Sequence, residues 1–422
     1  MKQRLSGKAR RAIRVGVVGV GRGQTFMHLA PIVGMELVAI CDTWKARLKE
    51  VGRQLKVATY TDYDKFLDHD LDAVVTANYF HEHAPLALKA LRAGKHVMSE
   101  TAACKTLAEG VALCRAVEET GKVYLFAENY PYTACNLEMR RLVQSGELGQ
   151  ALYGEGEYIH PMAYDDILRI SPGLRHWRNN TPCTYYCTHA LAPLMTATDT
   201  RPVSVNALAI PVPEGLLPER VFTGDLASVI LCRMDNGAVF RLIQGGLPGH
   251  SIWYRLHGTR GLAEHVRGPG YWGPGQIRVA HDPWQLKAGE VAERSYLPAF
   301  PAWAQAAARA GHGGGDFFTT HYFAEAIRTG KPPYLDVYRG VAMSVVGSLA
   351  WRSALESGKP FAVPDFRKES ARAAHENDHW SPFVEDEGPG QPPRGIRGTY
   401  KPTAKAVAHA REVWKEIGYT GV

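Results

Sequence analysis

The sequence predicts an α/β protein in which a doubly wound, parallel-sheet domain precedes an α+β domain with an open, mostly antiparallel sheet. Short apolar runs alternate with helical segments up to about residue 128, and alternating strands joined by tight turns follow them. The chain has 422 residues, more than one core usually organises, since domains hold about 150 residues. We therefore expect a dinucleotide-binding domain over 1–128, a substrate and oligomerisation domain over 129–360, and a C-terminal extension over 361–422.

The first domain should contain five apolar strands with helices between them. Strands separated by helices of roughly 10–15 residues indicate βαβ units, and these form a parallel sheet covered on both faces. The clearest helical segments are HAPLALKALRAG and TLAEGVALCRAVEETG, and the five strand segments are AIRVGVVGV, MELVAICD, LDAVVTAN, GKHVMSE and KVYLFAEN.

The second domain should begin with a helix that ends at Gly146 and continue as an antiparallel sheet. Tight turns at Asp235-Asn236-Gly237 and at 257–261 join segments that we expect to be antiparallel neighbours. Residues 262–315 are rich in Gly and Pro, which predicts long loops. The remaining expected elements are helices over 316–329 and 336–357 and a polar tail to Val422; the strand segments are ALYGEGEYIH, PVSVNALAIPV, LASVILCRMDNGAVFRLIQGG and SIWYRLHGTRGLAEHV.

Composition is typical of a globular protein, with 45% apolar and 22% charged residues. Apart from the run from Lys8 to Arg14, the basic residues behind the net charge of +7 are scattered, so we expect no nucleic-acid partner. The 7 cysteines form no CxxC pair, which is typical of reduced thiols in a cytoplasmic enzyme. No segment reaches the roughly 18 apolar residues that span a bilayer, and no signal peptide is recognisable, so no membrane association is expected.

A glycine-rich loop follows the first predicted strand. In VGVVGVGRGQTF, Gly19, Gly21 and Gly23 allow a sharp turn that brings backbone N–H groups close to a pyrophosphate at the start of a helix. The third glycine lies one residue early for the pattern GxGxxG, and Gln24 occupies the usual position. Asp42 ends the second strand, where a carboxylate accepts hydrogen bonds from a ribose diol and favours NAD over NADP.

The segment VVTANYFHEHAPLALKALRAGKHVMSE and, more weakly, LHGTRGLAE resemble the Gfo/Idh/MocA oxidoreductase family. The resemblance implies a Rossmann domain and a second domain whose open sheet faces the nicotinamide. Most members are sugar or polyol dehydrogenases, so it also implies a small-molecule sugar ligand and a homodimer or homotetramer. The cofactor-binding residues expected from the loop and the resemblance together are Gly19, Gly21, Arg22, Gly23, Gln24, Asp42, Asn78, His81, His83, Glu100 and Asn129.

Two family signatures are altered at the site where protons are transferred. In the family's Glu-Lys-Pro motif the glutamate corresponds to Glu100, but Thr101 and Ala102 replace the lysine and the proline. In its Asp-x-x-x-His motif the histidine corresponds to His189, but Tyr185 replaces the aspartate. Because the lysine would help to deprotonate an alcohol during hydride transfer, an ordinary dehydrogenase activity is not the first expectation.

These departures resemble one branch, the NAD-dependent glycosidases related to α-N-acetylgalactosaminidase. The matching segments are Glu100 with Ala102-Ala103, Glu128-Asn129, and 186–189 followed by 191–193; a proline is missing at 102 and a glycine at 192. In that branch a hydride leaves C3 of the glycoside, a base removes the C2 proton, and the aglycone is eliminated. Water then adds at C1 and the hydride returns, so NAD is reused and the carboxylate pair of ordinary glycosidases is not needed.

The resemblance assigns roles to four candidate catalytic residues. Tyr158 would remove the C2 proton, and His189, behind the helix N-cap Thr188, would take the proton of the C3 hydroxyl. Glu128, at the carboxyl end of a strand, would contact the nicotinamide ribose or the substrate. Tyr186 lies three residues before His189 and would share a helical face with it. The candidate substrate-binding residues are Trp177 as an apolar platform, Arg178 as a donor, and Tyr130.

Several alternatives stay open. A core role is possible for Tyr158, His189 and Trp177, and Lys45 and Arg47 leave the acceptance of NADP open. We expect no metal site, since zinc ligands usually show tighter repeated spacing than the cysteines near His189. The alternative functions are an NAD(P)-dependent sugar or polyol dehydrogenase and a non-catalytic dinucleotide-binding regulatory protein. The identity of the sugar, its anomer and its C2 substituent are not determined by the sequence.

Overall fold

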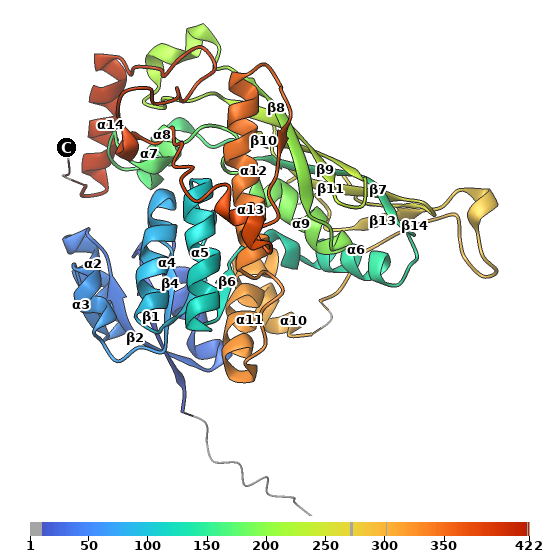
Figure 1. Cartoon of the computed structure of the whole chain (residues 1–422), viewed down its shortest axis with the longest axis horizontal. Helices are drawn as coiled ribbons and strands as arrows, with labels where there is room; N and C mark the ends of the chain where they lie inside the picture. The colour runs from blue at the N-terminus through green and yellow to red at the C-terminus, as the bar shows by residue number, and fades with distance from the viewer. Residues whose placement is uncertain (1–10, 271–272, 301, 420, 422) are drawn as a thin grey trace, which may run out of the picture.

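The predicted fold class is confirmed by a computed structural model that describes residues 11–270, 273–300, 302–419 and 421. A parallel sheet forms the N-terminal domain, and a large, mostly antiparallel sheet extends away from it (Figure 1). The first ten residues of the predicted domain 1–128, including the start of the basic run at Lys8, lie outside the described residues.

The parallel sheet has six strands in the order β3-β2-β1-β4-β5-β6. Strands β1, β4 and β6 are almost fully buried because helices cover both faces of the sheet, which explains their continuous apolar sequences. All five predicted strands are present, and β3, which has only three residues, was not predicted. The strands are β1 (Ile13–Val18), β2 (Met35–Cys41), β3 (Ala58–Tyr60), β4 (Ala73–Thr76), β5 (His96–Ser99) and β6 (Tyr124–Phe126); the helices are α1 (Gln24–Leu29), α2 (Lys45–Leu55), α3 (Tyr63–Leu67), α4 (His83–Arg92) and α5 (Leu107–Thr120).

Helix α5 shows how local sequence sets an element's start. The Thr106 hydroxyl accepts a hydrogen bond from Glu109 N at 3.2 Å, and the Glu109 carboxylate accepts one from Lys105 N at 2.8 Å. This reciprocal arrangement satisfies backbone donors that have no partner within the helix. It fixes where the chain turns back after β5, and therefore where Glu100 and Thr101 lie.

The second sheet has nine strands in the order β14-β13-β12-β11-β7-β10-β9-β8-β15. Its central strand β7 is antiparallel to β11 and parallel to β10. The predicted turn at 235–237 joins β9 to β10 as an antiparallel pair. Helix α9 packs on β7 and α12 packs on β8. The bounds are β7 (Ala151–Ile159), β8 (Pro202–Ile210), β9 (Ala227–Met234), β10 (Val239–Gly245), β11 (Ser251–Gly258), α6 (Ala134–Gln144), α7 (Tyr164–Ile170), α8 (Trp177–Asn180), α9 (Thr188–Thr198), α11 (Gly315–Thr329) and α12 (Val337–Leu355).

The expectation of long loops over 262–315 was wrong for three segments, which are two short strands and the helix α10 (Ala304–Ala308). Strands β13 (Ile277–Ala280) and β14 (Glu293–Tyr296) extend the sheet beyond β12 (Leu262–His265), and β13 pairs antiparallel with both neighbours. They are four-residue edge strands between Gly- and Pro-rich turns, so they carry little of the apolar alternation that reveals a longer strand. Residues 271, 272 and 301 of this region lie outside the described residues.

The C-terminal extension is also more regular than the predicted polar tail. It contributes β15 (Phe361–Ala362) to the sheet edge and contains the helices α13 (Glu369–Ala373) and α14 (Ala404–Glu416). Helix α14 packs on α7 beside the second domain (Figure 1), and Trp414 Nε1 donates to Leu168 O at 3.0 Å. Among the helices in the part of the chain that the structure describes, none has the length and apolarity needed to cross a membrane.

Candidate functional site

The predicted catalytic residues meet where the carboxyl ends of the parallel strands approach the second sheet. Glu128 follows β6, Tyr158 lies near the end of β7, and His189 lies in the first turn of α9. Carboxyl ends of parallel strands are where ligands bind in open α/β sheets. The site therefore lies between the two domains, with side chains from both.

His189 and Glu128 form a buried pair. His189 Nδ1 lies 2.7 Å from Glu128 Oε1 and 2.9 Å from Oε2, and Glu128 is 0% exposed. Tyr130 N donates to Glu128 Oε1 at 3.3 Å, and the Tyr254 hydroxyl donates to His189 O at 2.6 Å. A histidine whose Nδ1–H is donated to a carboxylate accepts protons at Nε2. Glu128 thus orients His189, a role that the sequence analysis did not assign to it.

Three tyrosine rings surround the imidazole of His189. The ring centroids of Tyr130, Tyr158 and Tyr186 lie 4.4, 4.6 and 4.7 Å from that of His189. Tyr186 lies in the turn before α9, and the helix N-cap is Cys187, so the predicted shared helical face and the N-cap at Thr188 were wrong. Burial raises the pKa of Tyr186, with Arg178 acting in the opposite direction.

The sequence analysis missed His160, which directly follows the end of β7, two residues after Tyr158. The two rings lie 5.7 Å apart, and the ring of His250 lies 5.2 Å from His160. Burial lowers the pKa of His160, and the neighbouring His250, His189 and Arg178 lower it further. His160 is therefore neutral near pH 7 and can accept a proton. Its spacing of two residues from Tyr158 at the end of a strand was the signal that could have revealed it.

Trp177 packs as a core side chain. It is 8% exposed and stacks on Phe80 with centroids 5.3 Å apart. The guanidinium of Arg178 lies 4.3 Å from the Trp177 ring centroid, and Arg178 itself is exposed. This arrangement favours the core alternative for Trp177 and leaves Arg178 as the side chain available to a substrate.

Arg22 joins the cofactor loop to two acidic side chains. Its Nε lies 2.6 Å from Glu100 Oε1, and its Nη2 lies 2.5 Å from Asp316 Oδ1. Asp316 also accepts from Asn129 Nδ2 at 2.9 Å and lies 2.8 Å from His312 Nδ1. Asp316 and His312 were not predicted, because a first-turn acid in α11 looks like an ordinary helix-terminal residue.

Charge pairing dominates the protonation of this cluster. Burial alone would lower the pKa of Arg22, but Glu100 and Asp316 raise it above its ordinary value. Burial would raise the pKa of Glu100 and of Asp316, but Arg22 lowers both, with His312 also lowering that of Asp316. All three groups are therefore ionised near pH 7, and Arg22 supplies the cation beside Glu100.

The turn directly after Glu100, residues 101–104, contains no Lys or Arg. Thr101 N donates to Glu100 Oε2 at 3.1 Å, and Thr101 itself is only 4% exposed. The peptide bond between Thr101 and Ala102 is cis. His83 Nδ1 lies 3.0 Å from Ala102 O, so His83 supports this turn from α4.

The glycine loop fits a dinucleotide. Gly19 has φ +97°, and a Cβ there would lie 2.4 Å from Ala77 O; a Cβ on Gly23 would lie 2.1 Å from Gly19 O. Gly21, in contrast, has no atom of the described residues within 4 Å of a Cβ position, so there is room beside its backbone for a pyrophosphate. Asp42 lies at the end of β2 and accepts from Val20 N at 2.7 Å.

Polar atoms without partners line the same edge. Buried Asn78 Oδ1 and Asn129 Oδ1 follow β4 and β6, and neither has a hydrogen-bond partner among the residues that the structure describes, as expected of groups that contact a ligand. Gln24 Nε2 donates to Val20 O at 2.6 Å and closes the loop on itself. Burial, with Lys105 and His83, lowers the pKa of His81 to about 4.

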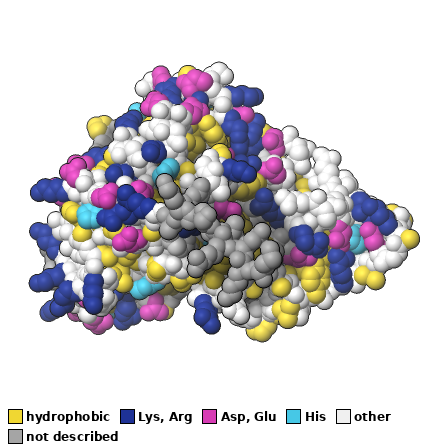
Figure 2. All heavy atoms as spheres, turned by 90° about the horizontal axis from the view of Figure 1, so that it is seen from below, with side chains coloured by type: hydrophobic (Ala, Val, Ile, Leu, Met, Phe, Trp, Pro, Cys, Tyr) yellow, Lys and Arg dark blue, Asp and Glu magenta, His cyan; other side chains and the backbone are white. Residues whose placement is uncertain are grey.

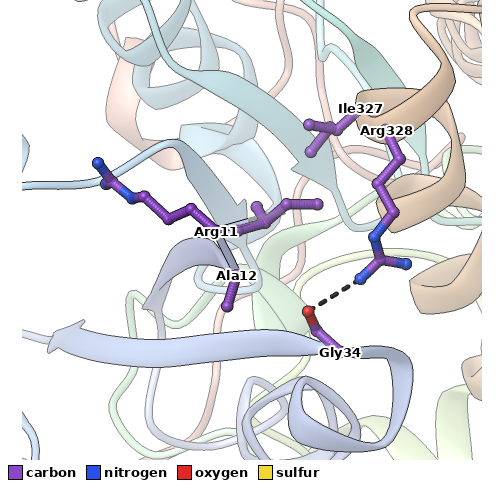
Figure 3. A pocket seen from close by; sticks show the side chains of 6 residues that line it. Arg11, Ala12, Gly34, Ile327 and Arg328 are labelled. Atoms are coloured by element: carbon purple, nitrogen blue, oxygen red, sulfur yellow. Dashed lines mark hydrogen bonds between the residues drawn. The ribbon is translucent and has the colours of Figure 1, made fainter. Parts of the chain in front are cut away.

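A cavity of about 410 Å³ lies away from this site. It is at the amino end of β1, where Arg328 donates to Gly34 O at 2.9 Å (Figure 3). That edge is opposite to the carboxyl ends of the strands, so the cavity plays no part in the site. Figure 2 shows Lys and Arg side chains spread over both ends of one face, with acidic side chains among them. Within the described ranges, no three His, Cys, Asp or Glu side chains are grouped as metal ligands.

Comparisons with known proteins agree with this architecture. The family model described as "Oxidoreductase family, NAD-binding Rossmann fold" matches residues 13–128, and "Glycosyl hydrolase 109, C-terminal domain" matches residues 221–372. A glycosyl hydrolase family 109 protein of Saccharopolyspora erythraea is 27% identical over 405 residues, covering 87% of this chain and 86% of that protein.

Further relatives give the same picture. A glycosyl hydrolase family 109 protein of Shewanella sp. (strain ANA-3) is 27% identical over 395 residues, covering 84% of this chain and 85% of that protein. A levoglucosan dehydrogenase in complex with NADH has the same fold, with a TM-score of 0.72 and 21% identity over 84% of this chain and 100% of that one. Residues 13–128 thus match the NAD-binding domain of the Gfo/Idh/MocA oxidoreductase family and residues 221–372 match the C-terminal domain of glycosyl hydrolase 109, and the chain is an NAD-dependent enzyme.

Proposed function

We propose that this protein is an NAD-dependent glycoside hydrolase that acts through transient oxidation at C3 of the sugar. The observation that carries the proposal is the buried His189–Glu128 pair with Tyr158 beside it, in a site where Thr101 replaces a lysine. Two adjacent groups that handle protons suit removal of protons from neighbouring positions of one sugar. The match to the glycosyl hydrolase 109 C-terminal domain also supports it.

The cofactor would be held by residues of the first domain. Gly19, Gly21 and Gly23 would surround the pyrophosphate, Asp42 would bind a ribose diol, and Asn129 lies where the nicotinamide end is expected. When bound, NAD supplies a hydride acceptor for C3 that gives the hydride back at the end of the cycle.

His189 and Tyr158 would then divide the two deprotonations. His189 takes the proton of the C3 hydroxyl as C3 becomes a carbonyl, and Glu128 stabilises the imidazolium that forms. The carbonyl acidifies the C2 proton, which Tyr158 removes. As the C1–C2 double bond forms, the bond from C1 to the aglycone breaks and the aglycone leaves with the electron pair.

Water completes the cycle. His160, kept neutral by its lowered pKa, takes a proton from the water whose oxygen adds to C1 and passes it to the aglycone oxygen. Tyr158, which accepted the C2 proton as its phenolate, returns that proton to C2. The C3 oxygen regains its proton from His189, so the net reaction is hydrolysis. Arg178, exposed over Trp177 and near Tyr186, would donate to a polar substituent of the sugar.

Deuterium labelling can test this route. The enzyme is incubated in D₂O with aryl glycosides of both anomers, while aglycone release and absorbance of reduced nicotinamide are followed. We expect aglycone release without steady accumulation of reduced cofactor, and deuterium at C2 of the released sugar. Since the His189–Glu128 pair could also serve a simple alcohol oxidation, the alternative is a sugar or polyol dehydrogenase. Net cofactor reduction with no aglycone release would establish that alternative.

Two substitutions should separate the steps. His189→Ala should abolish formation of bound reduced cofactor on mixing with substrate, because the first deprotonation is lost. Tyr158→Phe should still allow that reduction but stop aglycone release and deuterium incorporation at C2. Stopped-flow absorbance in a single turnover measures both. Equal loss of every signal in two folded variants would contradict the assigned sequence of steps.

A further inference from the structure

The C-terminal extension reaches the cofactor side of the first domain. Its residues from 373 onward lie outside both matched family regions. Phe383 stacks on Phe80 with ring centroids 5.7 Å apart and an interplanar angle of 17°, and Lys105 Nζ lies 2.5 Å from Asp386 Oδ2. The extension therefore fixes the segment that follows β4, which contains Asn78 and Tyr79.

The end of the extension brings Tyr419 to the carboxyl end of β2. Its ring meets that of Trp44 edge-on, with centroids 5.8 Å apart. Trp44 follows Asp42, and its N–H donates to Asp42 Oδ1 at 2.7 Å. On its other side, the Tyr419 hydroxyl would lie only 2.8 Å from a Cβ on Gly173. Tyr419 thus packs between Trp44 of the first domain and the segment before α8, which contains Gly173.

Tyr79 lies near the same place. Its ring packs edge-on against His176, with centroids 4.7 Å apart, and it remains 37% exposed. Burial raises the pKa of Tyr79, and Tyr419 and Asp42 are the next largest causes. Trp44 thus contacts both Asp42 and Tyr419, and Tyr79 lies close enough to Tyr419 and Asp42 for both to raise its pKa; the three aromatic residues come from segments far apart in the sequence.

We propose that Trp44, Tyr79 and Tyr419 form an aromatic clamp for the adenosine half of NAD, and that the C-terminal extension completes it by delivering Tyr419. A purine ring binds between aromatic side chains by stacking, and the ribose diol beside it would reach Asp42. Since Tyr419 closes the clamp, it slows release of the cofactor. This inference depends on NAD binding and not on the proposed glycosidase activity.

Cofactor exchange tests the clamp without any substrate. The full-length enzyme is loaded with NAD labelled in the adenine and diluted into excess unlabelled NAD, and retained label is followed by rapid filtration. We expect Tyr419→Ala to release NAD at least about tenfold faster, and Tyr419→Phe, which keeps the ring, to stay within about threefold of wild type. Lys415→Ala, at an exposed position of α14, the helix that precedes Tyr419, is the matched control. If Tyr419→Ala released NAD at the same rate as the wild-type enzyme, the proposal would be overturned.

Half-ligands distinguish a clamp from a general loosening of the structure. In calorimetric titrations of cofactor-free enzyme, Tyr419→Ala and Tyr79→Ala should weaken ADP-ribose binding about tenfold and leave nicotinamide mononucleotide binding unchanged. Melting temperatures near that of wild type show that the variants are folded. Equal weakening of both half-ligands would mean that Tyr419 acts through domain arrangement, and the clamp would be rejected. Failure of the glycosidase assay would leave these results unaffected.

Discussion

Arg22 is the residue on which the charge balance of the site depends. It pairs with Glu100 and with Asp316, whose side chains are 11% and 1% exposed. Arg22→Met should lower the free energy of unfolding by about 3–5 kcal/mol, because it leaves two carboxylates unpaired in a poorly solvated place. Urea unfolding of the wild-type and variant proteins measures this change in the free energy of unfolding. The triple variant Arg22→Met, Glu100→Gln, Asp316→Asn should recover most of the loss, whereas a cost below about 1 kcal/mol for the single variant would show that the pairs contribute little.

Thr101→Lys tests whether the altered motif is a damaged dehydrogenase or a different site. Arg22 already neutralises Glu100, so a lysine at position 101, which is only 4% exposed, would add an unpaired cation beside it. We expect loss of aglycone release and no steady reduction of NAD with free sugars or polyols. An unpaired buried charge lowers the free energy of unfolding by roughly several kcal/mol. Spectrophotometric assays of both reactions decide the question. Oxidation of a free polyol with turnover would favour the dehydrogenase function.

At the scale of elements, one glycine sets the distance between β7 and α9. A Cβ on Gly156 would lie 2.0 Å from Ala190 O, so the helix that carries His189 rests directly on the backbone of the strand that carries Tyr158. Gly156→Ala should cost about 1–3 kcal/mol of stability and, by moving His189 away from Tyr158, reduce single-turnover aglycone release by about tenfold or more.

A matched variant on the same strand separates position from stability. Gly154→Ala would place its Cβ 2.8 Å from a side-chain atom of Phe240, not from helix backbone. It should destabilise the fold by a similar amount but leave aglycone release per folded molecule nearly unchanged. Equal catalytic losses in the two variants would show that the contact of α9 with β7 has no special role in placing His189.

Elements with strong periodicity or burial were predictable, and short or distant features were not. The parallel strands are visible because both faces are buried, whereas β3 has three residues and β13 and β14 have four each. Helix α14 could have been found from Ala406, Ala410 and Val413, which share its buried face. The candidate catalytic residues came from a resemblance, and their grouping around His189 is visible only in the structure. The pairing of Arg22 with Asp316, 294 residues apart, has no local signal at all.

At the scale of the whole molecule, the extension ties the two domains together. Arg115 of α5 pairs with Glu369 of α13 at 2.5 Å, and α14 packs on α7 of the second domain. The groove for the cofactor and the site around His189 both lie between these domains. Their relative position is therefore held by the sheet contacts and also by the extension, whose residues from 373 onward lie outside both matched family regions.

Buried neutral histidines should make the whole fold sensitive to acid. Burial lowers the pKa of His265 to about 3 and, with Arg178 and His81, that of His176 to about 3, while that of His81 is lowered to about 4. In the unfolded chain a histidine titrates near pH 6.5. Between about pH 6.5 and 4 the unfolded state therefore binds more protons than the native state, and the free energy of unfolding falls as the pH is lowered.

The slope of stability against pH measures this effect. Below pH 6, each such histidine should lower the free energy of unfolding by about 1.4 kcal/mol for each pH unit that the pH falls. Burial raises the pKa of Glu109 to about 7, so above about pH 4.5 Glu109 changes the free energy of unfolding in the opposite direction. His265 Nε2 lies 2.9 Å from Asn136 Oδ1. His265→Asn should flatten the slope by one histidine's share in urea unfolding between pH 6 and 4.5, whatever it does to stability at pH 7. His28→Asn, at an exposed position, is the matched control, and an unchanged slope in His265→Asn would mean that His265 is already protonated in the native state over this range.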